Sequence, residues 1–105
     1  MNLKVHSIHF DADDKLIQFI ENRISKLSHF YDRIISGEVY LRLDKSEDTR
    51  NKIAEIRLNT PGKEFFAKRQ CKSFEEATDL AAEALRRQVR RKKGKSQQLL
   101  SKPII

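Results

Sequence analysis

Two periodicities run along the chain, and they separate the expected strands from the expected helices. Apolar residues three and four positions apart predict helices over 13–30 and 73–95, because this spacing lays one apolar stripe along an α-helix. Alternation of apolar and polar residues, with β-branched and aromatic side chains, is typical of strands. The expected strands are 3–10, 38–45, 52–59 and 64–70. The alternation of the first strand changes parity between Val5 and Ile8, so a bulge or an early bend near Ser7 is the alternative there.

The order of these elements is β-α-β-β-β-α. A sheet with one apolar face needs a covering layer, and the two amphipathic helices provide it. We therefore expect an α+β fold in which a four-stranded sheet carries both helices on one face. A chain of 105 residues suits one domain, expected over 1–95. The tail 96–105 has no sustained period and contains Pro103, so we expect it to be flexible.

The first expected helix combines an apolar stripe with a charged outer face. Asp13 stands before the stripe, where an aspartate caps a helix. Lys15, Arg23 and Lys26 lie on the outer face and by default are solvated charges. The stripe consists of Leu16, Ile20, Ile24, Leu27 and Tyr31.

The second expected helix has two different halves. Its first half carries an apolar stripe that needs a partner surface, and its second half places seven cations within residues 86–95. The stripe consists of Phe74, Ala77, Leu80, Ala81, Ala84, Leu85 and Val89. The cations are Arg86, Arg87, Arg90, Arg91, Lys92, Lys93 and Lys95.

A hairpin is expected between the last two strands. Thr60, Pro61, Gly62 and Lys63 have the composition of a tight turn. Alternation then predicts that Phe65 and Ala67 face the helices, while Phe66 and Lys68 lie on the opposite face, with the reverse parity as the alternative.

The positive charge is concentrated at one end of the chain. Residues 1–62 contain ten Lys or Arg and ten Asp or Glu, whereas 63–105 contain twelve and five, so the second segment carries the whole net charge of +7. Helix-terminal cations offset the helix dipole, but one or two are enough. Arg86 and Arg90, like Arg87 and Arg91, are like-charged pairs that repel across one helical turn. A polyanion, with nucleic acid as the leading candidate, is therefore the expected partner.

Other chemistry has little support in the sequence. Cys71 is the single cysteine, which excludes an internal disulfide, and it is interpreted as an incidental thiol at a strand end. His6 and His9 should point to opposite faces of their strand, and no glycine-rich phosphate loop is present. We expect no enzyme activity, no cofactor, no metal and no membrane association. Without an apolar span or a signal peptide, the protein is expected in the cytoplasm.

The order of elements and several short segments resemble the ribosome hibernation-promoting factors, also called ribosome-associated inhibitors or sigma-factor modulation proteins. The segment RISKL at 23–27 is similar to the family's basic first-helix motif, and FYDRI at 30–34 to its aromatic Asp-Arg-Ile ending. The last helix matches a Leu-x-Arg-Gln-Leu-x-Lys-x-Lys pattern through Leu85, Arg87, Gln88, Val89, Arg91 and Lys93. The chain is nearest to the short hibernation-promoting type.

The resemblance implies a protein that is monomeric when free and that binds the small ribosomal subunit between head and body. There it would occupy the channel for messenger RNA and the A- and P-site transfer RNAs, and so inhibit translation in starved or stationary-phase cells. Motif matches assign ribosomal RNA contacts to Arg23, Lys26, Arg87, Arg91 and Lys93. Proximity adds Arg86, Arg90 and Lys92. Ribosomal proteins are further possible partners, and no small-molecule substrate is expected.

Two alternatives use the same basic helix differently. A general RNA-binding or RNA-chaperone module would hold any RNA duplex through its phosphates. A protein-interaction module would instead dock the helix on an acidic partner, for example in regulating a sigma factor.

Overall fold

A computed structural model of the chain describes residues 1–45 and 48–101, with side chains in the last helix described as far as Arg91. The elements are β1 (Asn2–Ser7), α1 (Asp14–Phe30), β2 (Ser36–Leu43), β3 (Lys52–Thr60), β4 (Lys63–Cys71) and α2 (Phe74–Ser101). The predicted order β-α-β-β-β-α and the α+β class are confirmed.

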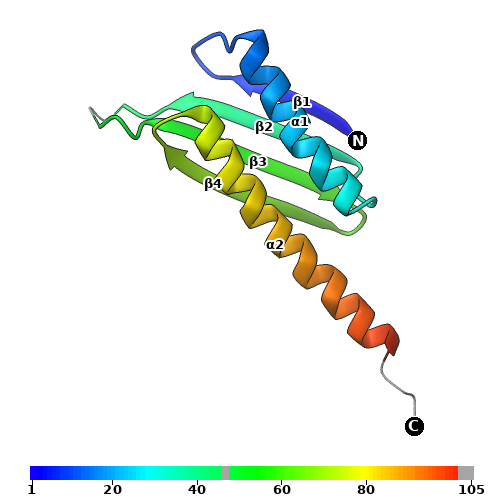
Figure 1. Cartoon of the computed structure of the whole chain (residues 1–105). Helices are drawn as coiled ribbons and strands as arrows, with labels where there is room; N and C mark the ends of the chain where they lie inside the picture. Colours follow the sequence, from blue (N-terminus) through cyan, green and yellow to red (C-terminus); the bar gives the residue numbers. More distant parts are fainter. Residues whose placement is uncertain (46–47, 102–105) are drawn as a thin grey trace.

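The four strands form one mixed sheet in the order β1-β2-β3-β4. β1 and β2 are parallel, because α1 carries the chain back across the sheet between them, whereas β2–β3 and β3–β4 are antiparallel. Both helices lie on the same face of the sheet, side by side, as predicted (Figure 1). α2 packs on β3 and β4 and then extends past the edge of the sheet (Figure 1).

The core lies between the sheet and the two helices. One row of paired residues across the sheet is Val5, Val39, Ile56 and Ala67. Ile20 and Ile24 of α1 and Ala81 and Leu85 of α2 are fully buried in the same core. The predicted apolar stripe of α1 is confirmed for Ile20, Ile24 and Leu27, which are buried. Asp13 caps the helix, as predicted, by accepting a hydrogen bond from the Leu16 amide at 2.8 Å.

The boundaries of the first two strands differ from prediction. β1 ends at Ser7 and not at Phe10, which agrees with the alternative of an early bend: the chain bends over residues 8–10, and His9 adopts a φ of 65°. β2 begins at Ser36, although Ser36 and Gly37 were expected to precede it. Gly37 is suited to this strand because a Cβ there would lie 3.1 Å from methyl carbons of both Leu3 and Leu58. Its neighbours in the sheet fill the space that a side chain would need.

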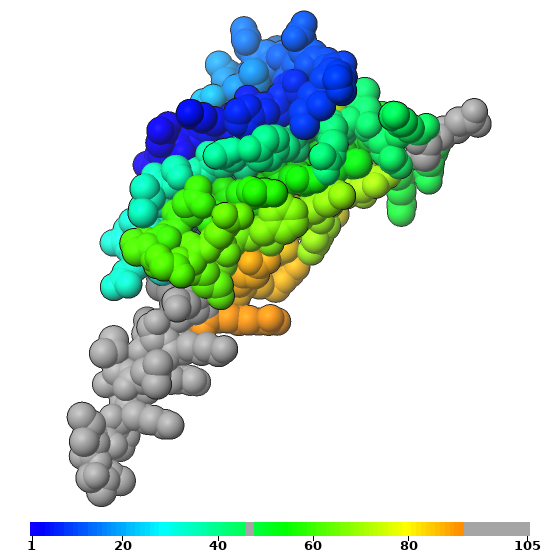
Figure 2. Space-filling view, turned by 180° about the vertical axis from the view of Figure 1, so that it is seen from behind, coloured from blue at the N-terminus to red at the C-terminus, as the bar shows by residue number. Residues whose placement is uncertain are grey.

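The β3–β4 hairpin has the predicted parity. Gly62 occupies the turn with a φ of 79°, a left-handed conformation that favours glycine. Phe65 and Ala67 are buried toward the helices, whereas Phe66 and Lys68 are exposed on the other face. That uncovered face of the sheet is seen in Figure 2, with the four strands side by side.

α2 is longer than predicted. It was expected to end at Lys95 but continues to Ser101, so residues 96–101 of the expected flexible tail are helical. The apolar period stops after Val89, the last buried residue of α2 among those whose side chains are described, and the end of the helix extends past the sheet (Figure 1). Residues 102–105 lie outside the described residues. Within the described part of the chain, neither helix is long and apolar enough to cross a membrane.

Candidate RNA-binding surface

Four arginines on α2 form an exposed cationic surface, which we call the basic tip: Arg86, Arg87, Arg90 and Arg91. Figure 2 shows this part of α2 emerging beyond the edge of β4. Val89 is fully buried between these arginines, and the Gln88 side-chain amide donates to the Phe66 carbonyl of β4 at 2.9 Å. These two contacts fix the start of the basic tip against the sheet.

The charge of the basic tip is not offset by nearby carboxylates. Across the described residues, no Asp or Glu forms an ion pair with any of its four arginines. The first turn of α2 contains Glu75 and Glu76, which suit the positive end of the helix dipole. All acidic residues of this helix precede the basic tip. They are Glu75, Glu76, Asp79 and Glu83. This charge separation along α2 leaves the four arginines of the basic tip exposed, without a carboxylate partner among the described residues.

Lys92 and Lys93 belong to the same helix, but their side chains lie outside the described residues. Their helical backbone continues the line of the basic tip. Their predicted RNA contacts stay predictions.

Arg23 is the predicted site residue whose surroundings differ from expectation. Its Nε donates to Asp79 Oδ1 at 3.0 Å, and its Nη2 donates to Glu83 Oε1 at 2.8 Å. Its side chain is only 18% exposed. Arg23 therefore links α1 to α2 and has its charge offset by two carboxylates, so an RNA contact by this residue stays a prediction.

Lys26 and Arg86 approach each other across a small pocket between the helices. This interhelical pocket has a volume of about 210 Å³ and is lined by Arg23, Lys26, Leu27, Phe30 and Arg86. The Arg86 guanidinium carbon lies 5.2 Å from the centre of the Phe30 ring, within the range of a cation–π contact. The structure thus brings Lys26 of α1 and Arg86 of α2 to one pocket, and their RNA contacts stay predictions.

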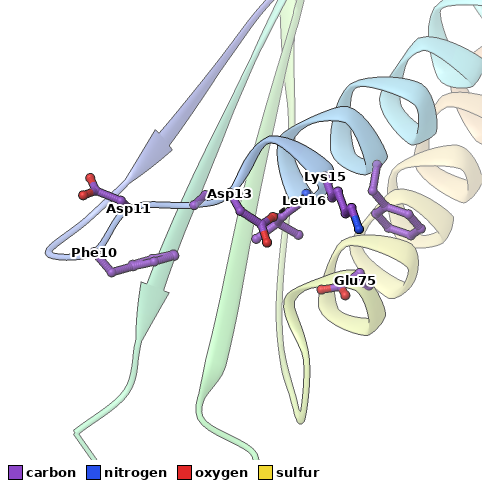
Figure 3. A pocket seen from close by; sticks show the side chains of 8 residues that line it. Phe10, Asp11, Asp13, Lys15, Leu16 and Glu75 are labelled. Carbon is purple, nitrogen blue, oxygen red and sulfur yellow. Dashed lines mark hydrogen bonds between the residues drawn. The ribbon is translucent and has the colours of Figure 1, made fainter.

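A second pocket, of about 480 Å³, lies at the opposite end of the helical layer and has a different character. In Figure 3, Leu16 and Lys15 at the start of α1 face Glu75 at the start of α2 across this space. Phe10 stacks on Phe74 beside it, with ring centres 5.0 Å apart. With three carboxylates among its lining residues, this end does not suit a polyanion. The lining residues are Phe10, Asp11, Ala12, Asp13, Lys15, Leu16, Phe19 and Glu75.

Cys71 is the last residue of β4 and is buried against the helices. Burial raises the pKa of its thiol above the ordinary value, and the nearby Glu76 raises it further. A raised pKa disfavours the thiolate, which is the reactive form. These surroundings agree with the interpretation of Cys71 as an incidental thiol at a strand end and not a nucleophile.

Solved structures show the same fold. A ribosomal subunit interface protein from Coxiella burnetii superposes with a TM-score of 0.80, at 18% identity, over 90% of this chain and 99% of that one. The N-terminal domain of Protein Y from Thermus thermophilus superposes with a TM-score of 0.74, at 24% identity, over 87% of this chain and 98% of that one.

Sequence comparisons identify relatives over most of the chain. A protein named ribosome hibernation promoting factor from Azotobacter vinelandii is 32% identical over 95 residues, which cover 90% of this chain and 85% of that protein. A protein of the same name from Pseudomonas putida is 24% identical over 100 residues, with 95% and 94% coverage. The family model described as Sigma 54 modulation protein / S30EA ribosomal protein matches residues 3–97. With nearly all of its folded core inside that match, the chain belongs to the Sigma 54 modulation protein / S30EA ribosomal protein family.

Proposed function

We propose that this protein is a cytoplasmic ribosome hibernation factor that acts by binding, without catalysis. The similarity to two proteins named ribosome hibernation promoting factor supports this role. The observation that carries the proposal is the basic tip, where four exposed arginines have no carboxylate partner among the described residues. Such a surface attracts the phosphates of ribosomal RNA.

The proposed binding site is the channel of the small ribosomal subunit that otherwise holds messenger RNA and the A- and P-site transfer RNAs. Occupying this channel excludes both ligands and blocks initiation in starved or stationary-phase cells. The proposed contacts come from the basic tip, from Lys26 on α1, and from Lys92 and Lys93 further along α2. Arg23 contributes mainly by holding α1 against α2.

The proposed recognition depends on phosphate and ribose groups and little on base sequence. Folded RNA is mostly helical, and proteins recognise such RNA through its shape, backbone and 2′-hydroxyl groups. Arginine suits this role because its guanidinium can donate two parallel hydrogen bonds to phosphate oxygens. With four to seven phosphates neutralised, log K should fall against log salt concentration with a slope of roughly −3 to −6.

Reversal of two charges on the basic tip tests the proposal. The variant Arg87→Glu/Arg91→Glu should bind isolated small subunits at least on the order of 100-fold more weakly, with a salt slope less steep by about two. Both side chains are exposed, so the fold should be retained. Sedimentation or fluorescence anisotropy at several salt concentrations measures the affinity, and thermal unfolding reports on the fold.

The matched control is Lys15→Glu/Lys72→Glu. It changes the net charge by the same amount as the first variant. Lys15 lies in the first turn of α1 and Lys72 shortly precedes α2, so both exposed positions lie at the opposite end of the molecule from the basic tip. It should retain affinity within a few-fold, roughly the effect of long-range charge alone. Equal loss in both variants would show that only total charge matters, and unchanged affinity of the first variant would contradict the proposal.

Two further measurements separate ribosome binding from the alternatives. A general duplex-binding module would be displaced from small subunits by excess random duplex RNA at physiological salt, whereas a ribosome-specific factor would not. A sigma-factor regulator would retain its partner after nuclease treatment of a cell extract. Co-sedimentation with small subunits or whole ribosomes in stationary-phase lysates is the result that the hibernation role requires.

A further inference from the structure

We propose that the interhelical pocket holds one unstacked nucleotide of the bound RNA, with the base inside the pocket and the phosphate at its rim. This inference rests on the function proposed above and adds a defined nucleotide position to it. Phosphate contacts along the basic tip fix the protein on the RNA, whereas this pocket would select a nucleotide that is free of base pairing.

The floor of the interhelical pocket is apolar. Leu27 is 2% exposed, and Phe30 is half-buried beside it. An isolated phosphate ion gains nothing from such a floor, because anions prefer water to apolar surfaces. A ligand with a flat, weakly polar face and an attached anionic group matches both the floor and the cationic rim. A nucleotide has these two parts.

Arg86 provides a stacking surface for the base. Its guanidinium carbon lies 5.2 Å from the Phe30 ring centre, and the residue is exposed, so the guanidinium is accessible from outside. Unstacked RNA bases are recognised by stacking on aromatic rings or on arginine guanidinium planes. A base inside the pocket would lie against the Arg86 guanidinium and the apolar floor, while the charge remains close to the phosphate.

One wall of the pocket is fixed before any ligand arrives. Arg23 lines the pocket while its donors are held by Asp79 and Glu83 at 3.0 and 2.8 Å. The two carboxylates do not line the pocket, whose other cationic lining residues are Lys26 and Arg86. The phosphate is therefore expected between these two cations. A wall that is already ordered lowers the entropy lost on binding.

The test is a pair of substitutions that preserve charge. Arg86→Lys keeps the cation but removes the planar group that stacks, and Arg90→Lys makes the same change at an exposed position that does not line the pocket. We expect Arg86→Lys to weaken binding to small subunits about tenfold more than Arg90→Lys does, because both variants lose the paired phosphate donors of a guanidinium and only Arg86→Lys also loses the stacking plane. The salt slope should stay the same in both variants, because neither removes a charge.

The outcomes distinguish this inference from the proposed function. Equal effects of Arg86→Lys and Arg90→Lys would overturn the nucleotide pocket, while binding of the unchanged protein to small subunits would still support the hibernation role. If the unchanged protein does not bind small subunits, the hibernation role fails, and the pocket is then tested with small probes.

The probes are AMP and ribose 5-phosphate, observed through the NMR signals of the Leu27 methyl groups and the Phe30 ring. AMP should shift these signals through its aromatic ring current, and ribose 5-phosphate at the same concentration should not. Absence of an AMP shift would overturn the pocket assignment. An equal shift with a glutamate decapeptide would also overturn it, by indicating an acidic protein segment as the ligand.

Discussion

Arg23 differs from the arginines of the basic tip in the groups around its guanidinium. Both Asp79 and Glu83 accept hydrogen bonds from it, and its side chain is mostly buried. The sequence shows that these two acids are one helical turn apart on α2, but not that α1 places a cation opposite them. The partners are 56 and 60 residues from Arg23 along the chain, and their contact depends on how the two helices align on the sheet.

Removing Asp79 and Glu83 as partners should separate the two roles considered for Arg23, which are the link between α1 and α2 and the predicted contact with RNA. In Asp79→Asn/Glu83→Gln, the ion pairs are lost, and the free energy of unfolding should fall by roughly 0.5–1 kcal/mol, because both acids are partly exposed to solvent. The released Arg23 should then contact a phosphate, so that the salt slope for small-subunit binding steepens by about one. Urea denaturation and salt-dependent binding measure the two effects.

The control for this pair is Glu75→Gln/Glu76→Gln. It removes the same charge from the same helix without touching Arg23. If this control steepens the salt slope as much as Asp79→Asn/Glu83→Gln does, the change reflects net charge, and the account of Arg23 as an offset cation is wrong.

At the scale of the element, α2 follows the predicted apolar stripe at most positions but not at Leu80. Leu80 is 45% exposed, whereas Ala81 and Leu85 are fully buried. Neighbouring residues point about 100° apart around a helix, so a side chain next to a buried one can lie outside the contact. The buried arc includes Thr78 and Ala82 instead. Periodicity identifies the helix, but the strands beneath decide which edge of the stripe is covered.

Two alanine substitutions on α2 test this packing. Leu85→Ala should lower the free energy of unfolding by about 2–5 kcal/mol, because it leaves a cavity in a core where this side chain is fully buried. Leu80→Ala makes the same chemical change on the exposed side and should change stability by less than about 0.5 kcal/mol. Urea denaturation with fitted midpoints and slopes compares the two. Similar losses would mean that Leu80 is covered in solution.

At the scale of the molecule, a sheet-based scaffold positions a cationic helix end. The sequence allowed the location of the excess charge to be predicted, because residues 1–62 sum to zero. It did not reveal that α2 continues past the sheet to Ser101, since helix without apolar periodicity looks like a tail. It also did not reveal the interhelical pocket, whose lining comes from two helices distant in sequence. These features depend on how the elements are arranged in space.

If the scaffold does not depend on the chain beyond the basic tip, a protein ending at Arg91 should fold but bind less well. Removal of residues 92–105 deletes four lysines and lowers the formal charge from +7 to +3 (7 − 4). Val89, the last core residue of α2 among those described, is retained, so the thermal midpoint should fall by no more than a few degrees. The salt slope for small-subunit binding should become less steep by about two, for the contacts proposed for Lys92 and Lys93.

The full-length variant Lys92→Gln/Lys93→Gln distinguishes lost charge from lost helix. It should reproduce most of the change in salt slope seen after truncation, because it removes the two proposed contacts and keeps the rest of α2. An unfolded truncated chain would show that residues 92–105 support the scaffold. Binding as tight as that of the unchanged protein, in both variants, would confine the RNA contacts to the basic tip and Lys26, because cations that touch phosphates cannot be removed without changing the salt dependence.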